Sequence, residues 1–131
     1  MTARTDPALA PILLIEDEPS VSAFVCTALE RKGYRVVQAS TGAEGLHQLA
    51  TETYGGVISD IRMPGDINGA DVHQWIQLNR PELGARIILI SGDTANSETQ
   101  SLLSRGSTPC IEKPFRVQQL ISTVEKTFGK P

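Results

Sequence analysis

The sequence predicts an open α/β fold, in which a sheet of five parallel strands is covered by helices on both faces. The first observation is an alternation between short, continuous apolar runs and segments in which apolar residues recur with the helical period. The second is that these runs lack the polar alternation of half-exposed strands, so both faces of the strands are predicted to be buried. The third is that 131 residues, 40% hydrophobic and 21% charged, suit one globular domain with its own core.

The first strand is predicted at residues 11–15, PILLI, and a helix follows it. Pro19 suits the first turn of that helix, where its missing N–H leaves no hydrogen bond unmade, and Gly33 ends the helix. The apolar face of the helix has members at i, i+3, i+4, i+7 and i+8, namely Val21, Phe24, Val25, Ala28 and Leu29.

The second strand is predicted at residues 34–39, and the third at residues 55–60, GGVISD. Between them, Thr41 and Glu44 have the spacing of a capping box at the start of a short helix. That helix carries Leu46, Leu49 and Ala50. After the third strand, residues 61–69 are dense in Pro, Gly, Asn and Asp, which is typical of a loop.

The third helix follows the loop and is expected to end near Pro81. One face of it carries Val72, Trp75, Ile76 and Asn79. The fourth strand is predicted at residues 86–91 and a short fifth strand at residues 108–113. Between these strands, Ser97–Gln100 resembles a second capping box, opening a helix with a thin apolar stripe of Leu102 and Leu103. The last helix has an apolar face of Val117, Leu120, Ile121, Val124 and Phe128.

These elements predict a flexible N-terminal arm at residues 1–10, one domain at residues 11–128 and a C-terminal tail at residues 129–131. A net charge of -3 argues against direct nucleic-acid binding, which normally needs a basic face. No run approaches the ~20 apolar residues of a membrane span, so no direct membrane contact is expected. Cys26 and Cys110 have neither disulfide-framework nor zinc spacing, which fits a reduced, cytoplasmic compartment.

Polar residues stand where the predicted strands end. They are Glu16 and Asp17 after the first strand, Asp60 after the third, Ser91 after the fourth and Lys113 after the fifth. Each alone has an ordinary interpretation as a helix cap, a turn former or a solvated lysine. However, the carboxyl ends of parallel strands share one edge of the sheet, which is where ligands bind in open α/β folds. The coincidence of all five at that edge therefore predicts a site.

Three carboxylates at one edge need protons or a cation. At ~4 Å and an effective dielectric near ~20, each pair repels by about 4 kcal/mol, equivalent to roughly three pKa units. Hard oxygen ligands without His or thiolate suit Mg²⁺, or Mn²⁺. Lys113 and Ser91 are suited to binding phosphate oxygens. The set favours phosphoryl transfer, in which one carboxylate serves as nucleophile and carries an acyl phosphate.

The sequence here resembles the receiver domain of two-component response regulators over about residues 10 to 128. The resemblance rests on the pair Glu16-Asp17, SDIRMPG around Asp60, ISG with Ser91, and EKPF with Lys113. Each motif is weak alone, but together, in this order and at strand ends, they are specific. The resemblance implies a flavodoxin-like fold with strand order 2-1-3-4-5.

The resemblance also implies roles for individual residues. Asp60 is expected to be the phosphoacceptor, which attacks the phosphohistidine of a histidine kinase or a histidine phosphotransfer domain. Mg²⁺ would be held by Asp17, Asp60, the backbone carbonyl of Arg62 and, largely through water, Glu16. Ser91 and Lys113 would bind the phosphoryl oxygens, and the Lys113–Pro114 peptide would be cis. Arg62 and Asp93, near the mouth of the site, would tune the lifetime of the acyl phosphate.

Three departures from the family pattern bear on function. The loop MPGDINGAD is one residue longer than the common form, so the entry to the third helix is expected to be displaced. Cys110 stands where many members have Tyr or Phe, so a switch in which an aromatic side chain swings inward is not expected. The Cys110 side chain is interpreted as a small buried hydrophobe at a position that modulates the site. The sequence after Phe128 shows no output domain, so the expectation is a stand-alone receiver or, as favoured here, the receiver of a hybrid, membrane-attached histidine kinase. The surface of the fourth helix, fifth strand and fifth helix is expected to contact a neighbour or a second copy.

Other interpretations stay open at this point. A flavodoxin-type cofactor site would need a loop of backbone N–H groups after the first strand, and EDEPS would instead repel phosphate. A phosphatase with an aspartyl nucleophile would need a second acid two residues after it, where Arg62 stands. A degenerate receiver that serves only as an interaction module is ranked below the active form, because all five site residues are present.

Overall fold

The computed structural model describes residues 10–63, 65–92 and 108–131. Within these ranges one parallel sheet has the strand order β2-β1-β3-β4-β5, which confirms the predicted fold class. Its strands are β1 (Ile12–Ile15), β2 (Val36–Ala39), β3 (Gly56–Asp60), β4 (Ile87–Ser91) and β5 (Cys110–Glu112). The helices are α1 (Pro19–Arg31), α2 (Gly42–Thr51), α3 (Gly69–Asn79), the 3₁₀ turn η3 (Pro81–Leu83) and α5 (Val117–Phe128). The helix predicted from Ser97 lies outside the described residues. No helix among those described has the length and apolar character needed to span a bilayer.

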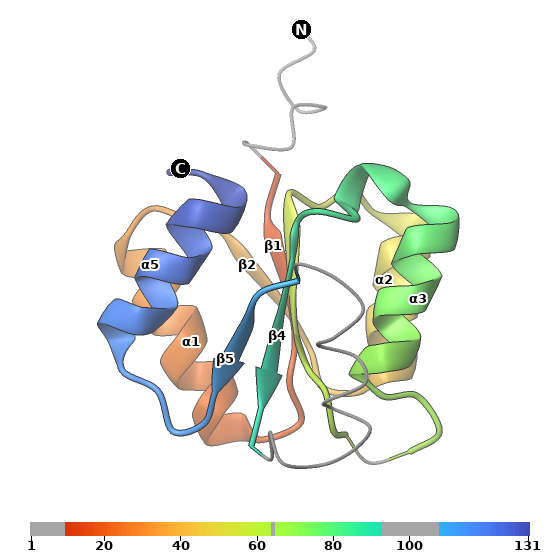
Figure 1. Ribbon diagram of the computed structural model, residues 1–131, viewed down its shortest axis with the longest axis horizontal. Coiled ribbons are helices and arrows are strands. Elements are labelled where there is room, and N and C mark those ends of the chain that lie inside the picture. Colours follow the sequence, from red (N-terminus) through yellow and green to blue (C-terminus); the bar gives the residue numbers. More distant parts are fainter. Residues whose placement is uncertain (1–9, 64, 93–107) are drawn as a thin grey trace, which may run out of the picture.

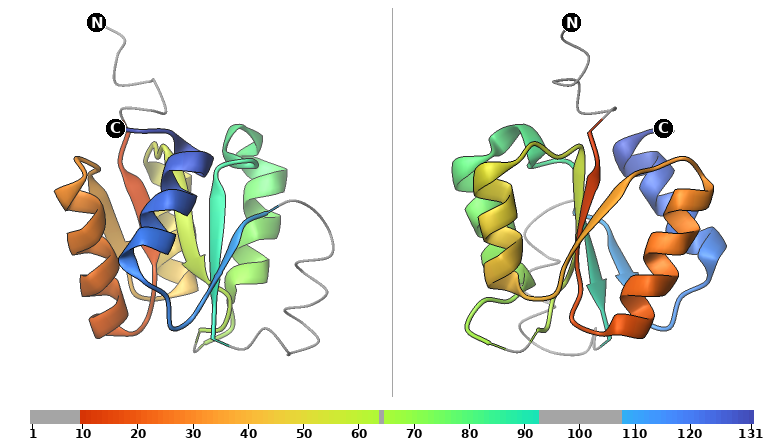
Figure 2. Two further views of the ribbon diagram at one scale, coloured as in Figure 1. Left: turned by 60° about the vertical axis from the view of Figure 1, so that its left-hand side comes forward. Right: turned by 180° about the vertical axis from the view of Figure 1, so that it is seen from behind.

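The sheet separates two hydrophobic cores. Helices α1 and α5 cover one face, and α2 and α3 cover the other, as the views from the front and from behind both show (Figures 1 and 2). Alternate residues of β1 point to opposite faces: Ile12 and Leu14 pack with α1 and α5, whereas Leu13 and Ile15 pack with the α2–α3 layer. Both faces of the central strands are therefore buried, which explains why their sequences are continuously apolar.

Two of the predicted helical faces extend beyond the core. Phe24 of α1 and Val117 of α5 were predicted on apolar faces, yet the side chain of each is 43% exposed. The helical period identifies the stripe but not how far each of its members is covered, and Phe24 and Val117 line a surface groove between α1 and α5. The Phe24 ring packs instead on Phe115, with the ring centroids 5.8 Å apart. Ala50 and Asn79, at the ends of α2 and α3, are likewise exposed.

Local signals set most of the helix ends. Gly33, with φ of 98°, follows the last turn of α1 in the left-handed region that glycine favours. At the start of α2, the Thr41 hydroxyl accepts a hydrogen bond from the N–H of Glu44 at 3.0 Å. The Glu44 carboxylate in turn accepts from the N–H of Ser40, the residue before the N-cap, at 2.7 Å, so the N-cap of the predicted box is present and Glu44 bonds one residue further out.

The connection from β3 to α3 brings the helix start against the strand end. The N–H of Gly69, the first residue of α3, donates to the carbonyl of Ile61 at 2.8 Å. A Cβ atom at this position would lie 2.5 Å from the backbone oxygen of Asp60, so only glycine fits. Asn68 and Asp71 form a reciprocal capping box there, which sequence reasoning missed. The backbone around Asp60 is thereby fixed on the side of α3.

At the other end of the sheet, where the strands begin, Arg86 links the start of β3 to the end of α5. Its guanidinium donates to the carbonyl of Gly55 at 2.5 Å and to that of Phe128 at 2.7 Å, and lies over the Phe128 ring. Gly56 allows this ring to approach, because a Cβ atom there would lie 2.7 Å from it. The end of α5 is thus tied to the amino end of the strand that carries Asp60.

Candidate functional site

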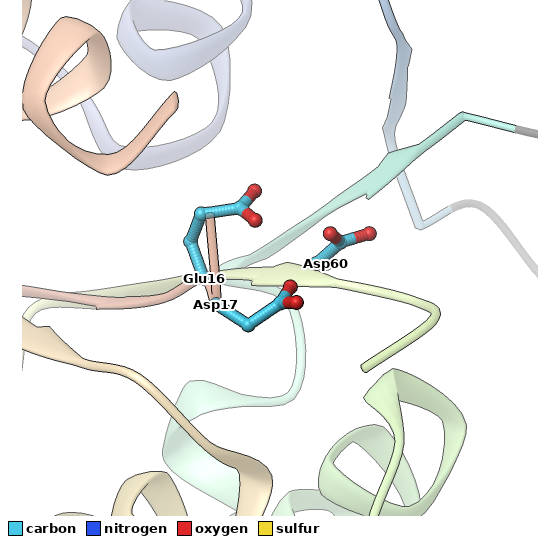
Figure 3. A group of neighbouring side chains, drawn as sticks. All are labelled: Glu16, Asp17 and Asp60. Atoms are coloured by element: carbon cyan, nitrogen blue, oxygen red, sulfur yellow. The ribbon is translucent and has the colours of Figure 1, made fainter. Parts of the chain in front are cut away.

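Three carboxylates meet at the carboxyl edge of the sheet. Asp60 is the last residue of β3, and Glu16 and Asp17 directly follow β1, the neighbouring strand. Because Ile15 pairs with Ser59, the next residues, Glu16 and Asp60, lie side by side. One oxygen from each of the three residues lies within 4.8 Å of the others, and the carboxylates turn toward a common region beyond the strand ends (Figure 3). Glu16 and Asp60 are buried, with 2% and 4% of their surface exposed.

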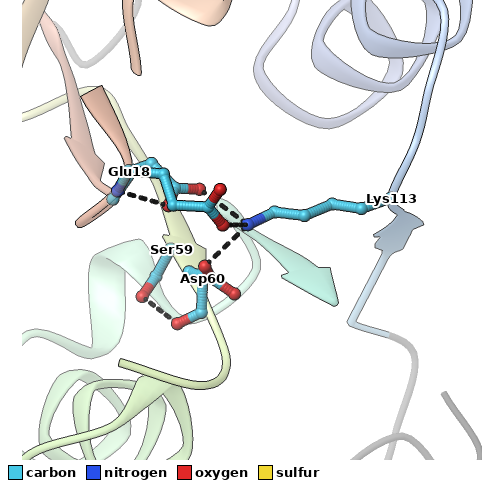
Figure 4. Close-up of polar contacts among 5 residues, drawn as sticks. Glu18, Ser59, Asp60 and Lys113 are labelled. Carbon is cyan, nitrogen blue, oxygen red and sulfur yellow. Dashed lines mark hydrogen bonds and ion pairs between the residues drawn. The ribbon is translucent and has the colours of Figure 1, made fainter. Parts of the chain in front are cut away.

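Lys113 reaches this cluster from the strand two places along the sheet. It follows β5, and its ammonium lies 2.9 Å from Asp60 Oδ2, 2.9 Å from Glu18 Oε1 and 3.3 Å from Glu16 Oε1 (Figure 4). Burial alone would lower the pKa of Lys113, but hydrogen bonds to Asp60 and Glu18 and the charges of Asp60 and Glu16 raise it above its usual value. The lysine is therefore a fixed positive charge directly beside Asp60.

The buried carboxylate of Glu16 has too few hydrogen-bond donors around it to stabilise its negative charge fully. Burial, and then the neighbouring charge of Asp60, raise its pKa to about 7, although the N–H of Glu18 donates to Oε2 at 3.1 Å and opposes the shift. The other oxygen, Oε1, has no hydrogen-bond partner among the described residues. It does lie 3.3 Å from the Lys113 ammonium, but without forming a hydrogen bond to it, so the contact is one of charge alone. A buried, under-satisfied carboxylate oxygen of this kind fits a cation ligand.

The remaining predicted residues are placed as follows. Ser91 ends β4, the strand between those of Asp60 and Lys113; it is 1% exposed, and its carbonyl accepts from the N–H of Lys113 at 2.7 Å. The Lys113–Pro114 peptide is cis, as predicted. Arg62 is exposed, two residues beyond the end of β3. Asp93 lies outside the described residues.

Cys110 opens β5 and is half-buried against the core between the sheet and the α2–α3 layer. Burial, and then the charge of Glu112, raise the pKa of its thiol. This is the environment of a packing residue and not of an activated thiolate.

Glu18 is the functional neighbour that sequence reasoning missed. Its backbone has the extended conformation of the N-cap residue of α1. The side chain makes no capping hydrogen bond and instead accepts from Lys113 (Figure 4). Three consecutive acids after β1 were the only available signal, and nothing in that run distinguishes the acid that faces the lysine.

This arrangement defines the class of site. A buried aspartate pairs with an ammonium and forms a cluster with two further carboxylates, at the strand ends of a doubly wound sheet. Oxygen ligands without nitrogen or sulfur suit Mg²⁺, which takes one or two carboxylates and keeps several waters. An aspartate held in this way is suited to accepting a phosphoryl group.

Comparison with known proteins identifies the family. The response regulator receiver domain family matches residues 12–125, so the chain belongs to that family. Among solved structures, a CheY-like response regulator receiver domain protein from Methanospirillum hungatei JF-1 superposes with a TM-score of 0.81 at 26% identity. That match covers 92% of this chain and 94% of the other.

Two curated relatives are longer proteins. The sensor kinase CckA of Brucella abortus is 30% identical over 125 residues, which is 92% of this chain but 13% of that protein. The transcriptional regulatory protein KdpE of Mycobacterium tuberculosis is 32% identical over 111 residues, which is 85% of this chain and 47% of that protein. The chain therefore spans less than half the length of either relative.

Proposed function

We propose that this receiver domain accepts a phosphoryl group on Asp60 from the phosphohistidine of a histidine kinase or a histidine phosphotransfer domain. The observation that carries the proposal is the position of Asp60, 2.9 Å from the Lys113 ammonium and within one cluster with Glu16 and Asp17. A carboxylate in this position has charge neutralisation available on both sides of the incoming group.

The chemistry follows from these contacts. A carboxylate oxygen of Asp60 forms a bond to phosphorus while the phosphorus–nitrogen bond to the donor imidazole breaks, and the imidazole nitrogen keeps the electron pair and takes a proton. Lys113 and Ser91 bind the equatorial oxygens as charge redistributes. Asp17, Asp60, the Arg62 carbonyl and, largely through water, Glu16 would hold Mg²⁺ or Mn²⁺, which would offset the negative charge of the carboxylates and the phosphoryl group. Hydrolysis reverses the modification when water attacks phosphorus and Asp60 leaves as the carboxylate.

The remaining parts of the proposal concern context. The domain comprises residues 11–128, between an arm at residues 1–10 and a tail at residues 129–131. Arg62 and Asp93 tune the lifetime of the acyl phosphate, and Cys110 holds a modulating position as a small packing residue of β5. The protein acts in the cytoplasm, as a stand-alone receiver or as a domain of a membrane-attached hybrid kinase, without itself binding nucleic acid or membrane. It relays phosphate or gates a neighbour, or a second copy, through a surface that includes β5, α5 and the expected fourth helix, which lies outside the described residues.

Acetyl phosphate with Mg²⁺ tests the proposal directly. The wild type should gain the mass of one phosphoryl group, and Asp60→Asn should gain none. Asp66→Asn, which removes an exposed acid from the loop after β3, is the matched control and should be labelled like wild type. Chelation of the metal should abolish labelling. If the wild type gains no phosphoryl group, the result would instead support an interaction module without phosphoacceptor activity. Sustained turnover of a phosphomonoester would support an aspartyl phosphatase.

A further inference from the structure

Glu18 and the phosphoryl group need the same partner. The Glu18 carboxylate lies 2.9 Å from the Lys113 ammonium, the same distance as Asp60 Oδ2, and Glu16 adds a third contact at 3.3 Å. An ammonium has three N–H donors, and here three carboxylates already surround it. Asp60 and Glu18 each accept one of these donors, so a phosphoryl oxygen on Asp60 that reaches Lys113 meets the Glu18 carboxylate there, and the two negative groups compete for the same ammonium.

Of the three contacts, the one to Glu18 is the easiest to break. The side chains of Glu16 and Asp60 are 0% and 5% exposed, whereas that of Glu18 is 55% exposed. Exposed ion pairs are weak, and the two buried carboxylates still hold the lysine when the third has left. Glu18 is also outside the set of three residues suited to the metal.

Glu18 has a second position available. It is the N-cap residue of α1, with φ of -87° and ψ of 114°, but its side chain makes no hydrogen bond to the helix. Pro19 occupies the first turn, and a carboxylate at this end of a helix is favoured by the exposed N–H groups and the helix dipole. The side chain that leaves Lys113 can thus cap the helix to which it belongs.

We propose that Glu18 is a positioning residue that holds Lys113 in the resting protein and competes with the phosphoryl group for it. This inference rests on the proposed phosphoacceptor function. Binding of a phosphoryl group displaces Glu18 from Lys113 toward the start of α1, and this exchange lowers the affinity of the site for the group. Removing the Glu18 charge should therefore tighten binding, because Lys113 no longer has to break that contact.

Beryllofluoride, a phosphoryl mimic, provides the affinity test. Its dissociation constant is measured by ¹⁹F NMR at saturating Mg²⁺ for wild type, Glu18→Gln and Asp66→Asn. Glu18→Gln should bind about three- to fivefold more tightly, which is the order expected for an exposed ion pair. Asp66→Asn removes one negative charge from the loop after β3 and should bind like wild type.

A second measurement follows Lys113 itself. The ¹H–¹⁵N signal of its ammonium should differ between wild type and Glu18→Gln in the free proteins and coincide when both are saturated with beryllofluoride. The role of Glu18 would be overturned if wild type and Glu18→Gln bind beryllofluoride equally well, or if Asp66→Asn tightens binding as much as Glu18→Gln. It would also be overturned if the Lys113 signals of wild type and Glu18→Gln still differ in the bound state. These outcomes all require a wild type that binds. A wild type that binds no beryllofluoride would overturn the phosphoacceptor function, and this inference with it.

Discussion

At the scale of single residues, the site is a balance between buried negative charge and one lysine. Glu16 and Asp60 are almost completely buried, and Lys113 is the cation that faces both of them in the described part of the chain. Buried charges of this kind are tolerated only while they remain paired. Changes in protonation or pairing should therefore alter the stability of the metal-free protein as well as its chemistry.

The first prediction is a pH dependence from Glu16. Its pKa is raised from 4.5 to about 7 in the folded protein, chiefly by burial. The stability contributed by protonated Glu16 is fully present below pH 4.5 and is lost as the pH rises through about 7. Urea unfolding without metal should show wild type losing stability across this window. Glu16→Gln should lose less, and a slope equal to that of wild type would contradict the assignment to Glu16.

The second prediction is that Lys113→Met destabilises the metal-free protein by about 2–3 kcal/mol at pH 8, because it leaves buried carboxylates unpaired. The loss should be smaller at pH 5, where Glu16 is protonated. Denaturant unfolding at the two pH values measures both effects. Lys126→Met, on the exposed part of α5, is the control and should change stability little. An equal loss at both pH values would exclude Glu16 as the group that responds.

At the scale of elements, the connection from β3 to α3 determines how Asp60 is presented. The start of α3 is held by the capping box of Asn68 and Asp71, and Gly69 lies directly against the backbone of Asp60 and Ile61. Helix start and strand end therefore form one packed unit. A disturbance at the helix start should be transmitted to Asp60.

The third prediction concerns Gly69. The methyl group of Gly69→Ala would lie 2.5 Å from the Asp60 carbonyl oxygen, and neither backbone segment can move without losing hydrogen bonds. We expect a loss of about 2 kcal/mol in unfolding free energy, which is typical of overpacking, together with slower labelling by acetyl phosphate. Gly92→Ala is the control, because the nearest atom to its added Cβ is 3.9 Å away. A Gly69→Ala variant as stable as the control would contradict the packing argument.

Sequence patterns predicted the elements better than their contacts. Continuous apolar runs located the central strands β1, β3 and β4, and the strand ends then placed Asp60 beside Glu16 and Asp17. The contact of Glu18 with Lys113 joins residues 95 positions apart and depends on side-chain directions, which no local pattern encodes. Likewise, the exposure of Phe24 depends on how α1 and α5 lie against each other, which the helical period does not encode. The fit of Gly69 against the Asp60 backbone depends on how the loop returns.

At the scale of the whole molecule, the sheet lies between two hydrophobic cores, one on each face. The acidic cluster and Lys113 come from residues at the ends of three of its strands. The cluster therefore forms only when β1, β3 and β5 are correctly assembled, since each contributes a different residue. Ligands that bind the cluster should consequently stabilise the entire folded state.

The fourth prediction follows from this linkage. Saturating Mg²⁺ and beryllofluoride should raise the thermal unfolding midpoint of wild type. A free ligand concentration 100 times the dissociation constant corresponds to about 2.7 kcal/mol. Asp60→Asn should show little of this shift, and Glu52→Gln, on the exposed end of α2, should show all of it. A shift of equal size in Asp60→Asn would mean that the ligands act elsewhere on the protein.

The hydrogen bonds of Arg86 to the carbonyls of Gly55 and Phe128 have, finally, a practical consequence for experiments. They hold the end of α5 at the amino end of the sheet, where the described chain also begins at Ala10, while the acidic cluster lies at the opposite end (Figure 1). A tether to a sensor surface, or a fluorophore attached beyond Lys130, would thus leave the strand ends accessible from solution. Immobilised protein should bind beryllofluoride as the free protein does, which makes kinetic measurements on many variants straightforward.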